Sequence, residues 1–248
     1  MGSVRQTYRS FKKKLKLYFS VNWYATWRFN LKMFPFATAR KLPVIFYGKI
    51  KFSNLEGKLI LDAPIKRGMI GFGQSFEFPT TSKGTAELYL QGTMICKGHV
   101  QIGKDVGIKV LKDAVLKMGH MACFGSEIRV LCTRGITLGN WTGIGYQSQL
   151  IDTNSHPMMN TETNTYYPLN GTIELGNYNA VSNRVSIMLH TKTPDNFVIA
   201  SNTLCNKDYT SLGENTLIGG IPAKKIRDNF KRDWESEKET LKKNKIIW

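Results

Sequence analysis

The sequence predicts a mainly β protein in which the chain coils into a solenoid of triangular cross-section. The first observation is a six-residue step between apolar positions, which places one inward side chain on each of three short sides. Four series share this step: Met94, Val100 and Val106; Ile102, Ile108 and Ala114; Leu138, Ile144 and Leu150; Leu175, Val181 and Ile187. Three steps complete a turn, and successive turns stack at roughly 4.8 Å with backbone hydrogen bonds between them.

The second observation is the density of glycine from about residue 50 onward, which is typical of turn-rich β structure. We expect small residues at the corners, where they let the chain bend sharply or adopt a positive φ. The candidate corner residues are Gly139, Gly145, Gly176 and Gly213. We therefore assign residues 51–221 to the coil. A chance apolar pattern in an ordinary β sandwich is the alternative, and the repeated rhythm disfavours it.

Residues 1–50 form a basic and aromatic arm that we expect to be partly helical. The chain carries a net charge of +17, and no Asp or Glu occurs before Glu56. Phe11, Leu15, Tyr18 and Phe19 recur at helical spacing among lysines, a composition typical of an interfacial amphipathic helix. Pro35 and Pro43 are expected to end or divide it. We favour contact of residues 1–45 with an anionic membrane surface. The alternative is packing against the same domain or a neighbouring subunit.

Two segments interrupt or end the rhythm. Residues 152–172 are too polar and irregular for a side of the coil, so we expect a protruding loop, which is where ligand contacts usually lie. After Pro222 the apolar positions Ile226, Phe230, Trp234 and Leu241 repeat on one helical face. This pattern predicts a C-terminal helix over residues 222–248, which we expect to cap the exposed end of the solenoid.

The four cysteines form no CxxC pair and show no close metal-ligand spacing, which predicts reduced thiols and no metal centre. No apolar run approaches the roughly 20 residues that span a bilayer, and the N-terminus lacks the apolar core of a signal peptide. We expect a cytoplasmic protein, held peripherally at the inner face of the membrane by its arm. Binding to nucleic acid is disfavoured, because the positive charge is concentrated in the arm rather than spread along the coil.

Three passages resemble the hexapeptide-repeat acyltransferases, a family of left-handed parallel β-helix enzymes, and within it the maltose and galactoside type of sugar O-acetyltransferase. They are Ile151-Asp152-Thr153-Asn154-Ser155-His156-Pro157, the coil from Val198 to Asp208, and Ile218-Gly219-Gly220-Ile221-Pro222-Ala223-Lys224-Lys225-Ile226. The resemblance covers roughly residues 95 to 230. The chain departs from the family pattern at Asn206, where threonine is usual, and at Ile221, where asparagine is usual. The segment 180–185 also lacks the usual Trp-Ile-Gly.

The resemblance implies that His156 is the general base that removes a proton from a sugar hydroxyl as it attacks the thioester of acetyl-CoA, without a covalent acyl-enzyme. An unperturbed histidine has a pKa near 6.5 and is largely neutral at cytoplasmic pH, so it can accept that proton. The other histidines, His99, His120 and His190, are interpreted as structural.

The same family pattern places acetyl-CoA against Asn183 and Ser201 at the thioester and pantetheine arm, and against Lys207 and Lys224 at the phosphates. The backbone amide of Asn183 is a candidate oxyanion donor. A carbohydrate or glycan acceptor is expected at the 152–172 loop. The residues assigned to acceptor binding are Asp152, Asn154, Asn160, Tyr166 and Tyr167. The family also implies a homotrimer with active sites between neighbouring prisms.

Several alternatives remain open at this stage. One alternative is an N-acyltransferase that acts on an amino-sugar, or an antibiotic acetyltransferase. The γ-type carbonic anhydrases share the predicted fold, but their zinc-binding histidines include a pair five residues apart, and His99, His120, His156 and His190 contain no such pair. A non-catalytic β-helix scaffold is the alternative from another functional class. The favoured function is O-acetylation of a surface polysaccharide, capsule or lipid-linked glycan precursor.

Overall fold

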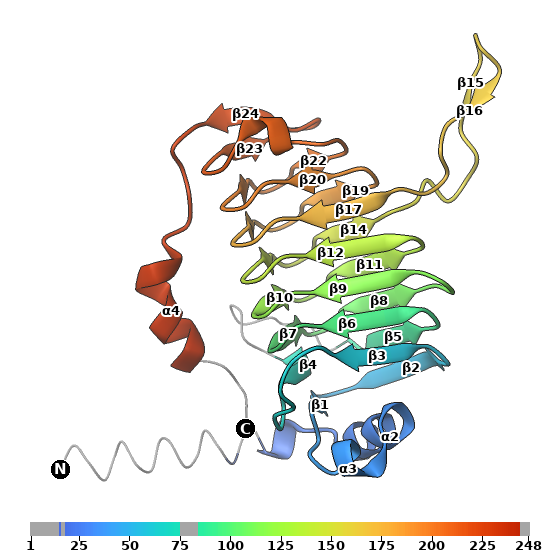
Figure 1. Ribbon diagram of the computed structural model, residues 1–248, viewed down its shortest axis with the longest axis vertical. Coiled ribbons are helices and arrows are strands. Elements are labelled where there is room, and N and C mark those ends of the chain that lie inside the picture. Colours follow the sequence, from blue (N-terminus) through green and yellow to red (C-terminus); the bar gives the residue numbers. More distant parts are fainter. Residues whose placement is uncertain (1–14, 16–17, 75–83, 244–248) are drawn as a thin grey trace.

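The structure, a computed structural model, describes residues 15, 18–74 and 84–243. Three sheets of short strands form the sides of a triangular prism (Figure 1). Within the described residues, the first sheet contains β1 (Val44–Phe46), β4 (Ile70–Gln74), β7 (Val100–Gly103), β10 (Ala122–Phe124), β13 (Gly143–Ile144), β18 (Ala180–Val181), β21 (Val198–Ile199), β23 (Leu217–Gly219) and β24 (Lys224–Arg227).

The second sheet contains β2 (Ile50–Leu55), β5 (Ala86–Leu90), β8 (Gly107–Val110), β11 (Arg129–Cys132), β14 (Gln149–Ile151), β19 (Ser186–Met188) and β22 (Leu204–Cys205). The third sheet contains β3 (Lys58–Leu61), β6 (Thr93–Cys96), β9 (Val115–Met118), β12 (Gly135–Leu138), β17 (Thr172–Leu175) and β20 (Lys192–Thr193). The chain visits the first, second and third sheets in turn, and its winding is left-handed (Figure 1). The predicted left-handed parallel β-helix is confirmed.

The six-residue step explains the core. Along three consecutive sides, Leu138 lies on the third sheet, Ile144 on the first and Leu150 on the second, and all three are buried. In the next coil Leu175, Val181 and Ile187 pair in register with them. The other predicted series are buried as well. Stacking in register turns each series into an apolar ladder along the prism axis, which removes water from the whole interior.

The corners use glycine mainly for close approach between coils. A Cβ at Gly139 would lie 2.5 Å from the backbone of the next coil at Gly176 and Asn177, so no side chain fits there. The positive φ that we expected of corner glycines occurs at Gly213, with φ 76°. At many other corners the position with positive φ holds a residue with a side chain, such as Trp141, Tyr178 and Asn202.

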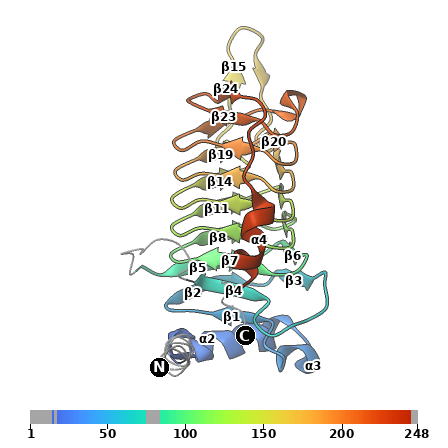
Figure 2. The same ribbon diagram turned by 90° about the vertical axis from the view of Figure 1, so that its left-hand side faces the viewer.

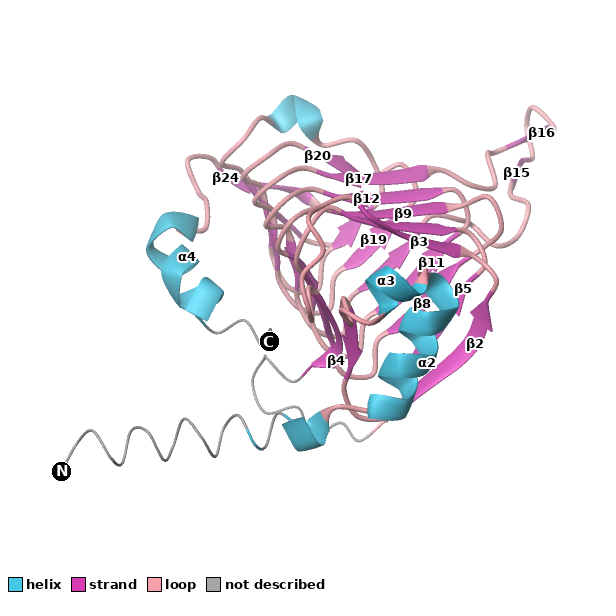
Figure 3. Ribbon diagram, turned by 60° about the horizontal axis from the view of Figure 1, so that its bottom comes forward, coloured by secondary structure: helices cyan, strands magenta, loops and turns pink. Residues whose placement is uncertain are grey.

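Helix α2 (Trp23–Met33) closes the N-terminal end of the prism (Figures 1 and 3). Its buried polar side chains satisfy the free edge of β1. The amide of Asn30 donates to the Val44 carbonyl at 2.7 Å, and the Thr26 hydroxyl accepts from the Phe46 amide at 3.1 Å. These bonds protect an edge that would otherwise pair with another chain.

Pro35 separates α2 from the short helix α3 (Phe36–Ala39), as the sequence predicts. The arm and the coil overlap, because β1 begins at Val44 within the segment assigned to the arm. Of the predicted helical repeat near the N-terminus, Leu15, Tyr18 and Phe19 are described and exposed, whereas Phe11 lies outside the described residues. Within the part of the chain that the structure describes, no helix has the length and apolar character needed to cross a membrane.

The C-terminal segment differs from the prediction of a capping helix. After the short 3-10 helix Thr210–Leu212, the last coil ends in β24, which pairs antiparallel with β23 and blocks that edge. Helix α4 (Trp234–Lys243) begins 12 residues after Pro222 and runs along the side of the prism (Figures 1 and 2). Trp234 packs against Trp141 and Tyr178, and its indole donates to the Tyr178 carbonyl at 3.0 Å.

Candidate functional site

The predicted loop leaves the prism where the second sheet passes to the third, a corner that we call the loop corner. Its strands β15 (Met159–Asn160) and β16 (Thr165–Tyr166) form a small antiparallel hairpin (Figures 1 and 3). At the root, Thr153 and Asn170 form an antiparallel bridge, and the Gly171 amide donates to the Asp152 carbonyl at 2.9 Å. The loop is therefore an insertion within one coil, and the coils on either side stack without a break.

Asp152 anchors this loop from inside the prism. Its side chain is fully buried, and both carboxylate oxygens accept hydrogen bonds from the preceding corner. One oxygen accepts from the Thr133 amide at 2.7 Å and the Thr133 hydroxyl at 2.8 Å. The other accepts from the amides of Arg134 and Gly135, each at 2.8 Å. Asp152, assigned to acceptor binding from the sequence, thus has its oxygens turned into the protein and holds the root of the loop.

The remaining loop residues are more open. His156 is exposed at a bend, where its amide donates to the Asn154 carbonyl at 2.7 Å. Tyr166 and Tyr167 are 71% and 55% exposed, and the Asn160 amide lies 3.5 Å from the Tyr167 hydroxyl. Asn154 is half-buried, and its side chain reaches the Pro168 carbonyl at 3.4 Å. The loop therefore presents an imidazole, amides and phenol rings to solvent.

Asn183 and Ser201 lie together at a different corner, between the first and second sheets, which we call the Asn183 corner. The two residues belong to adjacent coils, and the Ser201 hydroxyl donates to the Asn183 side-chain oxygen at 2.6 Å. The Asn202 amide donates to the Asn183 carbonyl at 3.2 Å. One coil further on, the backbone passes through Gly219 and Gly220. The structure therefore brings together two residues that were assigned to acetyl-CoA from separate motifs.

The two predicted phosphate-binding lysines are exposed and lie apart. Lys224 is on β24, which pairs with β23 next to the Asn183 corner. Lys207 follows β22 at the loop corner, with its ammonium 5.6 Å from the centre of the Tyr209 ring. Tyr209 is buried, and desolvation, with a smaller contribution from Cys205, raises the pKa of its phenol.

The predicted site residues therefore form two groups at opposite edges of the second sheet. His156 and Lys207 belong to the loop corner, and Asn183, Ser201 and Lys224 belong to the Asn183 corner. Between the two corners, the outer face of the second sheet carries a half-buried apolar column of Leu131, Ile151 and Met188 in register. The sequence analysis missed this column. Its signal in the sequence is an apolar residue directly after each of the inward positions Val130, Leu150 and Ile187. The pleat of the strand turns this following residue outward.

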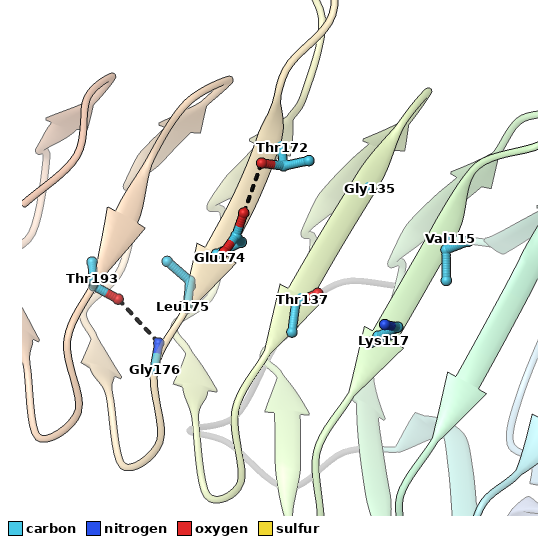
Figure 4. A pocket seen from close by; sticks show the side chains of 9 residues that line it. All are labelled: Val115, Lys117, Gly135, Thr137, Thr172, Glu174, Leu175, Gly176 and Thr193. Atoms are coloured by element: carbon cyan, nitrogen blue, oxygen red, sulfur yellow. Dashed lines mark hydrogen bonds between the residues drawn. The ribbon is translucent and has the colours of Figure 1, made fainter. Parts of the chain in front are cut away.

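A shallow hollow lies on the outer face of the third sheet, next to the end of the loop (Figure 4). Lys117, Thr137 and Glu174 line it, and Gly135 leaves its floor without a side chain. The Glu174 carboxylate accepts from the Thr172 hydroxyl at 2.9 Å and pairs with Lys192 at 3.2 Å. None of the residues assigned to the site from the sequence lines this hollow. Because none of the candidate residues lines it, we do not treat the hollow as the functional site.

The described residues contain no group of three or more His, Cys, Asp or Glu side chains arranged to hold a metal ion. The thiols of Cys96 and Cys205 are buried, and burial raises the pKa of each to about 12. Burial, together with the nearby Asp152 carboxylate, also raises the pKa of the Cys132 thiol. These three cysteines therefore remain protonated side chains of the core at neutral pH.

No protein-family model matches the chain, and no curated protein sequence matches it significantly. Among solved structures, the chain is similar to the polysialic-acid-specific acetyltransferase NeuO, with 20% identity, a TM-score of 0.46, and coverage of 77% of this chain and 78% of that chain.

It is also similar to the polysialic acid O-acetyltransferase OatWY, with 16% identity, a TM-score of 0.48, and coverage of 74% and 90%. A third is the hexapeptide-repeat acetyltransferase VCA0836 of Vibrio cholerae, solved with acetyl coenzyme A, with 18% identity, a TM-score of 0.37, and coverage of 54% and 64%. At such identities a shared activity does not follow from the similarity.

Proposed function

We propose that this protein is an acyltransferase built on a left-handed β-helix. More specifically, it transfers an acetyl group from acetyl-CoA to a hydroxyl of a sugar. The observation that carries the proposal is the exposed His156, presented on a loop that the buried Asp152 roots in the prism. A rigid coil supporting one exposed imidazole among amides and phenols is suited to general-base catalysis on a polyhydroxyl acceptor.

In the proposed step His156 accepts the proton of the acceptor hydroxyl while the oxygen attacks the thioester carbonyl carbon. The tetrahedral intermediate then collapses, the carbon–sulfur bond breaks, and the imidazolium returns its proton to the departing CoA thiolate. The products are an acetyl ester and free CoA, so atoms and charges balance without a metal or a covalent enzyme intermediate. An amide at Asn183 would stabilise the oxyanion, as preorganised donors do in acyl transfer.

The site is proposed to form between two copies of the chain. A single prism holds His156 and the Asn183–Ser201 pair at opposite edges of the second sheet. Three prisms with their second sheets turned toward a common axis set each loop corner against the next copy's Asn183 corner. Such a heterologous contact closes into a ring. The outward column of Leu131, Ile151 and Met188 supports this arrangement, because association would remove it from water.

Lys207 and Lys224 are proposed to bind the phosphates of CoA, one from each side of this interface. The acceptor is proposed to be a glycan, such as a surface polysaccharide, a capsule or a lipid-linked precursor. Asn154, Asn160, Tyr166 and Tyr167 would contact it from the loop. Residues 1–45 are proposed to hold the protein peripherally at the cytoplasmic face of the membrane.

The test is release of CoA and formation of acetyl ester by the purified full chain, assayed with acetyl-CoA against a panel of sugars, amino-sugars and glycan intermediates. His156→Ala is expected to lower turnover by about 10²–10⁴-fold, with acetyl-CoA affinity by calorimetry nearly unchanged. Full activity of this variant would remove the assignment of the base. Stoichiometric zinc in the purified protein would favour the carbonic anhydrase alternative, and absence of acetyl-CoA binding would favour a non-catalytic scaffold.

A further inference from the structure

Helix α2 has two sharply different faces. Ala25, Phe29 and the polar side chains of Thr26 and Asn30 are buried against the first coil. At 100° per residue, the opposite face carries Tyr24, Trp27 and Leu31 along its centre. These three side chains are 75%, 40% and 51% exposed. Because the buried face closes the end of the prism, the exposed face points away from the prism along its axis (Figures 1 and 3).

The surroundings of this exposed face are positively charged. Arg28 lies about 50° around the helix from the centre of the exposed face and Lys32 about 90° from it, at the border with the buried face, and both are exposed. Phe36, at the start of α3, is 69% exposed, and Arg40 and Lys41 follow it. The first acidic residue of the chain is Glu56, so α2, α3 and the segments that directly flank them in the sequence contain no acidic side chain. Together, Tyr24, Trp27, Arg28, Leu31, Lys32 and Phe36 form what we call the basal surface.

Two properties of this surface favour a membrane as its partner. Aromatic and leucine side chains flanked by arginine and lysine are the composition of helices that lie in the boundary between lipid headgroups and acyl chains. Nucleic acid is disfavoured because the centre of the face is apolar, whereas phosphate backbones are bound by cations and polar donors. Charge complementarity and the apolar centre therefore favour one partner, a bilayer that contains anionic phospholipid.

We propose that the basal surface docks on an anionic membrane and that the prism stands upright on it. This proposal deepens the proposed function by specifying the face that binds the membrane and the height of His156 above it. Its consequence for the acceptor rests on the proposed function. The loop leaves the coil of β13 and β14, and β13 is four strands from β1 in the first sheet. Four steps give roughly 19 Å, and a helix diameter of about 10 Å brings the loop root to roughly 30 Å above the lipid.

This height restricts the acceptor. The hairpin of β15 and β16 extends toward the end of the prism opposite α2, so the loop residues lie still further from the membrane (Figures 1 and 2). A hydroxyl on the sugar joined directly to a lipid is held at the headgroups and does not reach His156. The acceptor of the docked enzyme is therefore a hydroxyl on a glycan that extends several units from its anchor, or a glycan that is free in solution.

Flotation of the full chain with vesicles tests the docking. Binding is expected to vesicles of phosphatidylcholine with phosphatidylglycerol and not to phosphatidylcholine alone. Trp27→Ser/Leu31→Ser is expected to lower the partition constant about tenfold, and Arg28→Glu/Lys32→Glu by at least about tenfold. The controls are Ile226→Ser, an exposed apolar residue on β24 at the opposite end of the prism, and Lys112→Glu/Lys117→Glu, which changes net charge equally at exposed positions above the first coil. Neither control is expected to reduce binding.

Several outcomes would overturn the docking. They are no flotation of the wild type, flotation that does not depend on phosphatidylglycerol, or basal variants that behave like the controls. If the basal surface instead contacts a second copy, the Trp27→Ser/Leu31→Ser variant changes the mass measured by light scattering in the absence of lipid. Neutron reflectometry on a supported bilayer tests the orientation. The seven strand steps from β1 to β23 plus the helix predict a protein layer roughly 45 Å thick, and a much thinner layer would contradict the upright prism.

The restriction on the acceptor is tested separately from the activity itself. With vesicle-bound protein, a lipid carrying one acceptor sugar is expected to remain unmodified, whereas a lipid carrying a polymer of the same sugar is acetylated. Equal rates on the two lipids would overturn the height argument. Turnover of the soluble glycan without vesicles is expected to be the same in wild type and basal variants. Its absence in the wild type would refute the proposed function and leave the flotation result intact.

Discussion

Replacing Asp152 with asparagine should show how firmly the loop is rooted in the prism. The change keeps the shape of the side chain and exchanges one acceptor oxygen for an NH₂ group. In the less costly orientation the new NH₂ group faces Thr133. The Thr133 hydroxyl then turns to accept a hydrogen bond from this group, and the Thr133 backbone amide loses its acceptor. A buried amide without an acceptor costs about 1–3 kcal/mol. The bonds from Arg134 and Gly135 then reach a neutral oxygen rather than a charged one, which costs about 1 kcal/mol each.

Relief of the carboxylate's desolvation offsets part of this cost, so we expect a net loss of roughly 2–4 kcal/mol. For a chain of this length, that loss corresponds to a fall in Tm of roughly 5–15 °C. Hydrogen exchange by mass spectrometry is expected to show faster exchange of the amides at residues 133–135. Asp113→Asn, at an exposed corner with φ 65°, is the matched control and should leave Tm unchanged. A Tm within 1–2 °C of the wild type, with unchanged exchange, would refute the anchoring role.

Three further predictions follow from the contacts described. Asn183→Ala and Ser201→Ala should each weaken acetyl-CoA binding in calorimetry. Because a 2.6 Å hydrogen bond joins the two side chains, the double variant should lose less binding free energy than the sum of the two single losses. Strictly additive losses would contradict a shared role. Gly139→Ala should destabilise the coil by about 1–3 kcal/mol in thermal unfolding, whereas Gly135→Ala, whose Cβ finds ordinary contact at 3.6 Å, should be tolerated. Stability should fall as pH rises from about 9 to about 12, because burial raises the pKa of Cys96 and Cys205 from 9.0 to about 12, so the folded state holds protons that the unfolded state releases. Cys96→Ala/Cys205→Ala should flatten that alkaline decline in denaturant titrations, and an unchanged slope would contradict this cause.

The apolar periodicity predicted the coil because each inward position faces the same environment in every turn. It did not predict how the ends are closed. The repeat of Ile226, Phe230 and Trp234 looked helical, yet the free edge of β23 is satisfied by pairing with β24, so Ile226 lies in a strand and is 58% exposed. The start of α4 does have a local signal, because Asp233 accepts from the Ser236 amide at 3.2 Å. The closure of the N-terminal end by α2 was not predicted, because Thr26 and Asn30 form hydrogen bonds with the backbone of β1. Local sequence patterns do not reveal such tertiary contacts.

Candidate site residues could be named from the sequence, but which of them lie together could not be predicted. Motifs placed Asn183 and Ser201 in the same role, and the stacking of coils brings them into contact. The separation of His156 from that pair follows from which corner of the prism each occupies. The burial of Asp152 was hidden for a related reason, since its partners at residues 133–135 belong to the preceding coil. The catalytic and binding roles themselves stay predictions.

The closure of both ends of the prism makes the coil a spacer of fixed length. With β1 covered by α2 and β23 covered by β24, another turn cannot be appended at either end and has to be inserted between existing turns. Each turn inserted between α2 and the loop would move His156 roughly 4.8 Å further from the basal surface while leaving the loop corner and the Asn183 corner unchanged. The distance of His156 from the basal surface and the arrangement of residues at the two corners are thus separately adjustable in this architecture. A variant with one turn duplicated below β13 would be a direct way to change the height of His156 above the basal surface.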